Sequence, residues 1–394
     1  MVAVAKFLFL VIVVSSWIGC SNKPTISGII QFSEGEDFQK KVYLIQPQNL
    51  NDIAASFFGK VIDSAIIESN GTFQFNNLPA VSEPTLFELA VQQKGSDSNQ
   101  LQNDDPSTDN YIPFVLQENE SIKITAHGES FQQNFSIKNP SEVNKELLAL
   151  RDIKLQSFLK NIKNKQWDVH EGSQLLEKEE ALLNYQKALI GFAENANALL
   201  PALVALRWVS PQNDYERTPE FLFQQCEQWK ENKHPWARQL CEKANKEYLP
   251  VLEGDTFPDA KLPLSSGETT NLYANLGSKL TIIDLWASWC VPCRKENRDF
   301  LVPLWDAYYE KGFQIIAYGL ETNNEAWKSA IEKDGAYRWL HASDLQGDEA
   351  AFMKTLRIQT IPANFILDTE GKVIAKNLHG EKLQQFVSSF FEGK

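Results

Sequence analysis

An apolar strand that leads directly into a pair of cysteines lies in the last third of the chain. Residues 280–293 read Leu-Thr-Ile-Ile-Asp-Leu-Trp-Ala-Ser-Trp-Cys-Val-Pro-Cys. The first seven form a nearly continuous apolar run, which is typical of a buried strand in a parallel sheet. A helical pattern follows from Pro292 to about Glu310, with proline near its start. The sequence therefore places both cysteines at the N-terminus of a helix, where they can close a disulfide and where a thiolate is stabilised.

The two cysteines of this motif occupy different positions and are expected to have different roles. Cys290 stands at the helix start and is the expected nucleophile, whereas Cys293 is one turn further in, better buried, and would resolve a mixed disulfide. A zinc site is the alternative, but it requires a second pair of ligands. The other cysteines, Cys20, Cys226 and Cys241, lie elsewhere in the chain at the wrong spacing. We therefore predict a redox pair, with no metal and no further cofactor.

Strand and helix patterns alternate around this motif. Further strands are expected at 314–318, 363–367 and 373–376, the last two forming an antiparallel pair around the turn 368–371. Further helices are expected at 325–333, near 349–355 and at 382–391. Such alternation predicts an α/β fold for residues 251–394.

This segment resembles the thioredoxin superfamily and, within it, the membrane-anchored TlpA/ResA-like thiol-disulfide oxidoreductases. The resemblance rests on the Trp-Cys-x-x-Cys motif, on the apolar strand before it, and on Ile361-Pro362 ahead of a strand. It covers residues 255–394, about a third of the chain. It implies that Pro362 is cis and faces the disulfide, and that the backbone beside it, including Ile361, pairs with the substrate chain. Ala363 departs from the Thr that commonly follows this proline.

Two carboxylates flank the cysteine pair. Asp284 lies six residues before Cys290 and matches the buried Asp of thioredoxins. Burial in an apolar strand should raise its pKa and suit it to exchange protons with Cys293. Glu296 lies three residues after Cys293 on the same helix face and matches a Glu of the cytochrome c maturation branch. The alternatives are that Asp284 faces the surface and that Glu296 is a solvated helix residue.

The surroundings of the cysteines also bear on the direction of electron flow. Trp286 is expected in the core, while Trp289 should shield the disulfide and contact substrate. The dipeptide Val291-Pro292 contains no His to stabilise a thiolate, and nearby carboxylates raise the pKa of thiols. Both features favour an enzyme that reduces disulfides in other exported proteins, supplied with electrons by an unidentified donor. The alternatives are an oxidase or isomerase of the same fold, or a non-enzymatic anchored scaffold.

The N-terminus has the pattern of an export signal. Residues 1–19 contain Lys6 and then a stretch, 7–18, in which ten of twelve residues are apolar, too short to span a bilayer as a helix. Gly19-Cys20 resembles the lipobox of bacterial lipoproteins, which implies cleavage before Cys20 and its acylation; an ordinary signal peptide is the alternative. Residues 20–26 would be a lipid-anchored tether. We expect a periplasm-facing protein in the envelope of a Gram-negative-type bacterium.

Two further regions precede the α/β segment. Residues 27–138 show short β-type runs and a hairpin signal at Asn70-Gly71, which predict an antiparallel sandwich or partial barrel. Residues 139–250 have helical periodicity, with Pro201 as a kink or break. The first 250 residues resemble the β domain and helices found ahead of thioredoxin modules in exported lipoproteins, which implies no activity for them.

Cys226 and Cys241 lie symmetrically about the break 232–235 between two helical segments. An antiparallel helical hairpin would place them at matching heights, so a structural disulfide is expected in an exported protein. Two buried thiols are the alternative.

Length and charge limit the remaining possibilities. The 394 residues suggest two to three domains at about 150 residues each. With 38 Lys and Arg against 51 Asp and Glu, the net charge is −13. A chain this acidic is repelled by phosphate backbones, so no nucleic-acid partner is expected.

Overall fold

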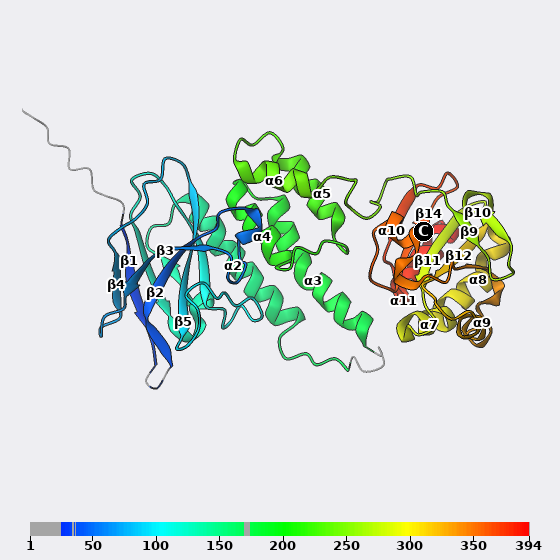
Figure 1. Cartoon of the computed structure of the whole chain (residues 1–394), viewed down its shortest axis with the longest axis horizontal. Helices are drawn as coiled ribbons and strands as arrows, with labels where there is room; N and C mark the ends of the chain where they lie inside the picture. The colour runs from blue at the N-terminus through cyan, green and yellow to red at the C-terminus, as the bar shows by residue number, and fades with distance from the viewer. Residues whose placement is uncertain (1–24, 34, 36, 169–173, 394) are drawn as a thin grey trace, which may run out of the picture.

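The computed structural model describes residues 25–33, 35, 37–168 and 174–393, which form three parts that follow one another along the long axis (Figure 1). Strands occupy the N-terminal end, helices the middle, and a mixed α/β domain the other end. The expected signal peptide 1–19, Cys20 and most of the tether 20–26 lie outside the described residues. Among the residues that are described, no helix combines the length and apolar character needed to cross a membrane.

The N-terminal part is a sandwich of two four-stranded sheets. One sheet has the order β3 (Lys60–Ile66), β2 (Phe38–Gln46), β5 (Thr85–Gln93) and β6 (Tyr111–Leu116). The other has the order β4 (Thr72–Phe75), β1 (Ile26–Gln31), β7 (Ile122–His127) and β8 (Ser136–Ile137). Apolar residues of both sheets, such as Ile30 and Phe87, share one core. The expectation of an all-β region is confirmed.

Two details of this sandwich differ from the sequence prediction. Strands β1 and β7 pair in parallel, so the second sheet is mixed and not antiparallel. The turn at Asn70-Gly71 forms, with Gly71 at φ 83, but β3 and β4 enter different sheets instead of pairing as a hairpin. The backbone N–H of Ile30 donates to the Gly71 carbonyl at 2.9 Å, so the chain joins β1 after the turn. A turn signal specifies the reversal of the chain, whereas the partner strand is chosen by distant residues.

In its described residues, 139–168 and 174–250, the middle part consists mainly of five helices. They are α2 (Glu142–Asn161), α3 (Leu175–Glu194), α4 (Leu199–Val209), α5 (Pro219–Trp229) and α6 (Pro235–Lys243), preceded by the short α1 (Phe131–Asn134). Their core is continuous with one sheet of the sandwich, since Leu86 and Tyr111 pack with residues of α4 such as Leu203. Pro201 lies in the first turn of α4, where a backbone donor is not needed, and the break falls before it, at 195–198.

The C-terminal domain contains a five-stranded sheet. Its order is β13 (Leu340–Ala342), β12 (Phe313–Gly319), β11 (Leu280–Trp286), β14 (Ala363–Leu367) and β15 (Val373–Lys376). The first three strands are mutually parallel, while β14 and β15 run antiparallel to their neighbours. A separate hairpin consists of β9 (Lys261–Pro263) and β10 (Thr269–Asn271). The fully buried β11 stands at the centre of the sheet, as its apolar run predicts.

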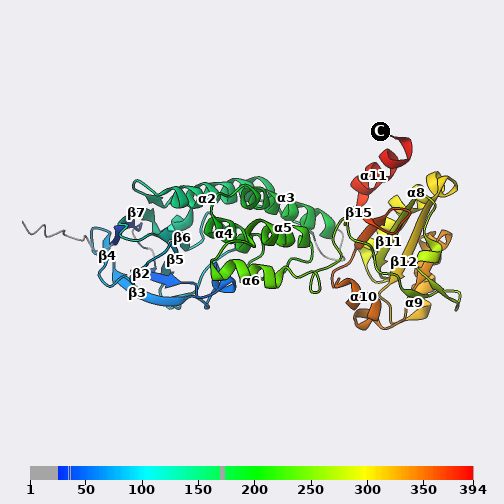
Figure 2. The same cartoon turned by 90° about the horizontal axis from the view of Figure 1, so that it is seen from above.

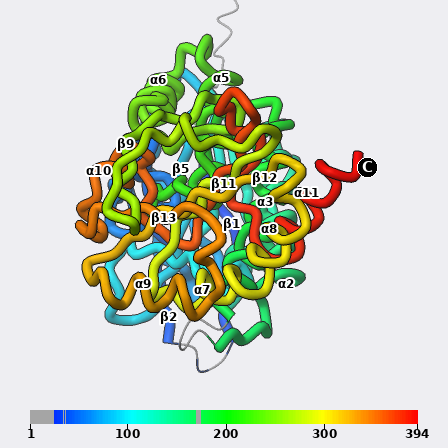
Figure 3. Tube along the Cα trace, turned by 90° about the vertical axis from the view of Figure 1, so that its right-hand side faces the viewer, coloured from blue at the N-terminus to red at the C-terminus, as the bar shows by residue number. Residues whose placement is uncertain are grey.

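Helices cover both faces of this sheet (Figure 2). On one face lie α7 (Val291–Glu296), α8 (Val302–Tyr308), α9 (Asn324–Lys333) and α11 (Gly380–Glu392). On the other face lies α10 (Ala351–Leu356), whose Phe352 packs against Tyr318 of β12. Seen along the long axis from this end of the molecule, α11 lies at the rim of the domain (Figure 3). The predicted α/β fold of the C-terminal segment is confirmed.

The helix expected from Pro292 to Glu310 is divided by one π-helical turn at Asn297–Leu301. There the N–H of Val302 donates to the carbonyl of Asn297, five residues earlier. Pro303 follows directly and has no N–H for the regular ladder, and its ring would clash with the carbonyl four residues before it. A π turn removes this conflict while the chain remains helical.

Candidate active site

Cys290 and Cys293 form a disulfide at the N-terminus of α7, directly after the central strand. Their Cα atoms are 5.3 Å apart. Cys290 is the residue that caps the helix, and its Sγ accepts a hydrogen bond from the backbone N–H of Cys293 at 3.3 Å. Pro292 fits the first turn because the N–H groups there have no intrahelical partner. The local sequence thus holds Cys290 Sγ where helix dipole and N–H groups favour negative charge.

The loop between β11 and α7 is held by residues that sequence reasoning missed. The backbone N–H and the hydroxyl of Ser288 both donate to the carboxylate of Glu321, the hydroxyl at 2.9 Å. Arg294 donates to the Ser288 carbonyl at 3.1 Å and forms an ion pair with Asp334. Burial raises the pKa of Glu321. Glu321 follows the end of β12, the strand beside β11, so only the pairing of these strands brings it to the loop.

Asp284 lies in the middle of β11 and is 3% exposed, so the surface-facing alternative is excluded. Burial raises the pKa of its carboxyl well above its usual range, and the nearby charge of Glu296 raises this pKa further. Desolvation disfavours the charged form of a carboxyl, and a like charge adds to that cost. Asp284 therefore stays protonated at pH values where an ordinary aspartate is ionised.

Glu296 is 4% exposed and is not a solvated helix residue. Its Oε2 lies 2.9 Å from Nδ1 of His379, and its Oε1 accepts a hydrogen bond from the backbone N–H of Gly380 at 3.0 Å. Gly380 is the first residue of α11, so the carboxylate sits at a helix N-terminus, where negative charge is favoured. His379 was not singled out from sequence, because it lies more than 80 residues from Glu296 and belongs to no motif.

Strand pairing places Pro362 at the edge of the sheet where the cysteine loop leaves β11. β14 begins at Ala363, which pairs with Leu285 near the end of β11, so the residues before β14 stand next to the loop that carries the cysteines. The Ile361–Pro362 peptide bond is cis. The carbonyl of Pro362 accepts a hydrogen bond from Arg217 of the helical part at 3.0 Å.

The two tryptophans of the motif face opposite environments. Trp286 is completely buried and packs against His341, whereas Trp289 is 63% exposed. An exposed indole next to Cys290 provides an apolar surface at the position where a disulfide partner would approach. Within the described part of the chain, no group of three or more His, Cys, Asp or Glu residues is arranged to hold a metal ion.

Comparison with known proteins agrees with this geometry. Residues 252–390 match the family model described as Redoxin. Residues 252–390 are a Redoxin domain of the thioredoxin superfamily.

The Redoxin domain is similar to two groups of curated relatives. Over 114 residues it is 29% identical to the thiol-disulfide oxidoreductase ResA of Bacillus thuringiensis, covering 29% of this chain and 62% of that protein. Over 123 residues it is 28% identical to the thiol:disulfide interchange protein DsbE of Pseudomonas fluorescens, covering 30% and 63%. This chain thus spans less than two thirds of the length of either relative. The expected TlpA/ResA-like character of this domain is confirmed.

Solved structures include a thiol:disulfide interchange protein from Bacteroides sp.. It is 30% identical, with 36% of this chain and 92% of that chain covered and a TM-score of 0.34.

Proposed function

We propose that the protein is a thiol-disulfide oxidoreductase of the cell envelope that reduces disulfides in other proteins through Cys290 and Cys293. The observation that carries this proposal is the disulfide at the start of α7, with Cys290 as the helix cap and a buried carboxyl, Asp284, on the preceding strand. The names of the relatives, thiol-disulfide oxidoreductase and thiol:disulfide interchange protein, support the same chemistry.

The reaction would proceed in two exchanges. In the reduced protein, the Cys290 thiolate attacks one sulfur of a client disulfide, a mixed disulfide forms, and the other client sulfur leaves as a thiolate. Cys293 then loses its proton and attacks Cys290 Sγ, which releases the second client thiol and closes the Cys290–Cys293 bond seen in the structure. The client gains two electrons, and a separate thiol donor must return two electrons and two protons.

Asp284 is the better candidate to accept the proton of Cys293. Its raised pKa brings its affinity for a proton closer to that of a thiol, whose ordinary pKa is about 8.5. The Glu296 carboxylate is already engaged by His379 and Gly380. We therefore assign Glu296 an indirect role, in which its charge raises the pKa of Asp284.

The direction of electron flow follows from the same charges. A dithiol is a strong oxidant when its thiolate is stabilised, and acidic side chains near the pair have the opposite effect. Neither Val291 nor Pro292 supplies a cation between the cysteines. We expect a redox potential close to or below about −270 mV, the value for thioredoxin. A potential above about −200 mV at equilibrium with glutathione would support an oxidase or isomerase instead.

The location of the protein is part of the proposal. The apolar stretch 7–18 followed by Gly19-Cys20 supports export and acylation of Cys20, with the protein facing the periplasm. Mass spectrometry of the detergent-extracted protein tests this directly. A mature chain that begins elsewhere, or an unmodified Cys20, would refute the anchor.

Trapping of intermediates tests the mechanism. Cys293→Ser leaves the first exchange intact and removes the second, so clients should accumulate as mixed disulfides with Cys290 and can be identified by mass spectrometry. Cys290→Ser is the matched control and should trap nothing. If Cys293→Ser captures no protein in the native envelope and the wild type reduces no model disulfide, the proposed function is wrong.

A further inference from the structure

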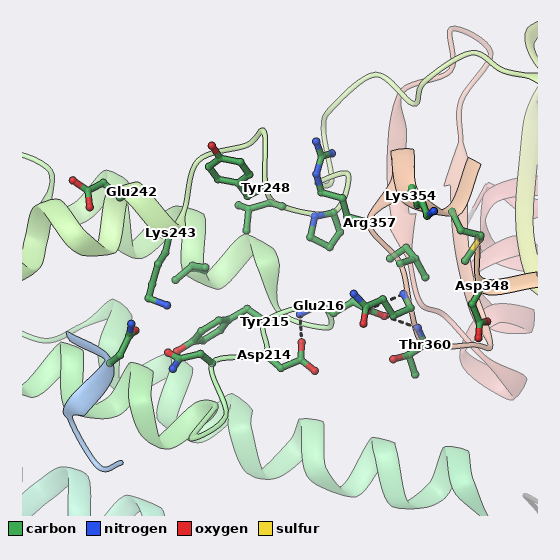
Figure 4. Close-up of a pocket in the computed structure, with 18 of the residues that line it drawn as sticks. Asp214, Tyr215, Glu216, Glu242, Lys243, Tyr248, Asp348, Lys354, Arg357 and Thr360 are labelled. Carbon is green, nitrogen blue, oxygen red and sulfur yellow. Dashed lines mark hydrogen bonds between the residues drawn. The ribbon is translucent and has the colours of Figure 1, made fainter. Parts of the chain in front are cut away.

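Glu216, in the helical part, accepts hydrogen bonds from the backbone just before the cis proline. This residue lies in the loop between α4 and α5, and its two carboxylate oxygens accept hydrogen bonds from the backbone N–H groups of Gln359 and Thr360, each at 3.0 Å (Figure 4). A carboxylate that accepts two backbone N–H groups forms charge-assisted bonds, which are stronger than neutral ones. The segment 359–362 is therefore positioned from outside the Redoxin domain.

The next residue, Arg217, extends this contact past the proline. One terminal nitrogen donates to the Pro362 carbonyl and the other to Oδ1 of Asn377, both at 3.0 Å. Its Nε lies 2.7 Å from a carboxylate oxygen of Glu179 on α3. Lys376, on β15, adds an ion pair with Glu220 at 2.6 Å. The helical part thus contacts the backbone on both sides of Ile361.

Ile361 lies between these held residues, with its side chain 9% exposed. In the part of the chain that the structure describes, neither its backbone N–H nor its carbonyl forms a hydrogen bond. An extended peptide commonly binds to such backbone groups as an added strand, with neighbouring pockets providing specificity.

A pocket of about 1310 Å³ opens beside this segment, between the two parts of the molecule. Tyr248 and Lys243 line it from the helical part, and Arg357 and Thr360 from the Redoxin domain (Figure 4). Tyr248 is 68% exposed, so a large aromatic surface is uncovered at its edge. Sites for small molecules have volumes of about 300–1,000 Å³, so the size of this pocket suits a segment of polypeptide.

We propose that this pocket binds the polypeptide of the client protein, and that Glu216 and Arg217 are positioning residues that hold the segment 359–362, of which Gln359 and Thr360 line the pocket. The inference rests on the proposed function and adds a binding site for the client's polypeptide, which would favour disulfides carried by extended polypeptide over small disulfides. The helical part is then half of the client site, because Tyr248 and Lys243 face the client from that side.

Two probes with the same leaving group separate the pocket from the redox chemistry. One is a linear peptide of about ten residues, long enough to extend beyond the pocket, whose single cysteine is in a disulfide with 2-nitro-5-thiobenzoate. The other is 5,5′-dithiobis(2-nitrobenzoate), which has no peptide backbone. The reduced full chain should release 2-nitro-5-thiobenzoate from both, while Cys290 and Cys293 are oxidised to the disulfide.

Variants of the positioning residues should affect the two probes differently. Arg217→Ala and Glu216→Gln should each lower kcat/KM for the peptide about tenfold, mainly through KM, because charge-assisted hydrogen bonds are lost. The rate with the small disulfide should fall by less than about twofold. Arg217→Lys, which keeps one cation but not the planar fork, should recover part of the loss. Arg238→Ala on the exposed face of α6 is the matched control and should resemble the wild type.

Tyr248→Ala tests the pocket without disturbing the fold, because this exposed side chain can be removed without leaving a cavity in the core. It should raise KM for the peptide and leave the small disulfide unaffected. An unchanged KM for the peptide in Tyr248→Ala, or equal losses with both probes in the Arg217 and Glu216 variants, would overturn the inference. A wild type that releases 2-nitro-5-thiobenzoate from neither probe would instead count against the proposed function.

Discussion

The part of the chain that the structure describes contains two disulfides whose surroundings differ in almost every respect. Cys226–Cys241 joins the bodies of α5 and α6 over a separation of 15 residues, with Cα atoms 4.8 Å apart. Cys290–Cys293 spans three residues within one helical turn, at the helix N-terminus. A bond that closes a long loop restricts the unfolded chain, whereas one that closes a short loop does so far less. The same covalent bond is therefore suited to stability in the first place and to repeated opening in the second.

The two disulfides also differ in the charged groups that surround them. Asp284 and Glu296 are buried in the same domain as Cys290–Cys293, and the pKa of Asp284 is raised by burial and by Glu296. Cys226 and Cys241 lie past the first turn of their helices, where the helix N-terminus no longer favours a thiolate. Buried carboxylates are costly to keep in a core, so their presence in the domain of Cys290–Cys293 supports the proposal that proton transfer takes place there.

The largest expected effect is on activity. Cys290→Ser should abolish release of 2-nitro-5-thiobenzoate from 5,5′-dithiobis(2-nitrobenzoate), a loss on the order of a thousandfold, because no other sulfur can replace the attacking thiolate. The double variant Cys226→Ser/Cys241→Ser should keep the rate within about twofold of the wild type. If the double variant loses activity to the same extent, the two disulfides are not separate in function.

The second effect concerns stability, which should depend on Cys226–Cys241 and not on Cys290–Cys293. Loss of Cys226–Cys241 should lower the free energy of unfolding of the helical part by about 3 kcal/mol, as the chain-entropy account of a 15-residue loop predicts. Hydrogen exchange of amides in α5 and α6 measures this locally. Reduction of Cys290–Cys293 should change the exchange of these amides very little. Equal protection in the double variant and the wild type would show that the bond is not structural.

Asp284→Asn should slow the resolving step about tenfold to a hundredfold, because a positioned base contributes roughly 10²-fold or more to proton transfer. Stopped-flow decay of a preformed mixed disulfide at Cys290 isolates that step. Asp299→Asn, on the exposed face of the same helical segment, is the matched control. A normal rate in Asp284→Asn would transfer the role of base to another group.

Because the pKa of Asp284 is raised, we also predict how the free energy of unfolding depends on pH. A carboxyl whose pKa is raised by folding costs the fold nothing below about pH 4, where it is protonated in both states. As the pH rises from there to the folded pKa, the unfolded state gains by ionising, and the wild type is destabilised by up to about 1.4 kcal/mol per pH unit. Asp284→Asn should therefore gain stability relative to the wild type with rising pH, as urea unfolding at several pH values would show. A difference that stays constant with pH contradicts the assignment.

The smallest effect is expected for Glu296→Gln. Removal of this charge takes away one of the two causes that raise the pKa of Asp284, so the pH midpoint of the resolving step should move down by up to about one unit. The rate itself should fall about threefold or less. Glu310→Gln, at an exposed position, serves as control. A shift of the midpoint to higher pH would mean that Glu296 acts on Cys293 by another route.

Much of the redox site was predictable from local sequence. The buried strand, the proline-containing helix start and the spacing of Cys290 and Cys293 are all encoded within fourteen consecutive residues. Burial of Asp284 followed from the apolar residues on both sides of it. The helical break around which Cys226 and Cys241 are arranged was also readable, since proline and short polar residues interrupt helices.

The features that were predicted wrongly or missed from sequence have a common cause. The parallel pairing of β1 with β7 joins strands about 95 residues apart, and the π turn results from Pro303 within a continuous helical pattern. His379, Glu321 and Arg217 reach the site from other elements. No local pattern marks them, because an isolated charged residue in a sequence has the same appearance whether it is solvated or paired in a fold.

Sequence alone was sufficient to propose the chemistry of this protein: which sulfur atoms would exchange disulfides, and which carboxyl in the same domain is buried. Periodicity and spacing act over a few residues, and those interactions hold in any context. The tertiary structure was needed for what surrounds that chemistry. It showed that His379 and Gly380 contact the carboxylate of Glu296, and that Glu321 accepts hydrogen bonds from the cysteine loop. It also showed that Glu216 and Arg217 bind the backbone on either side of Ile361. These contacts depend on which strands and helices become neighbours, and that choice is made by the packing of whole cores.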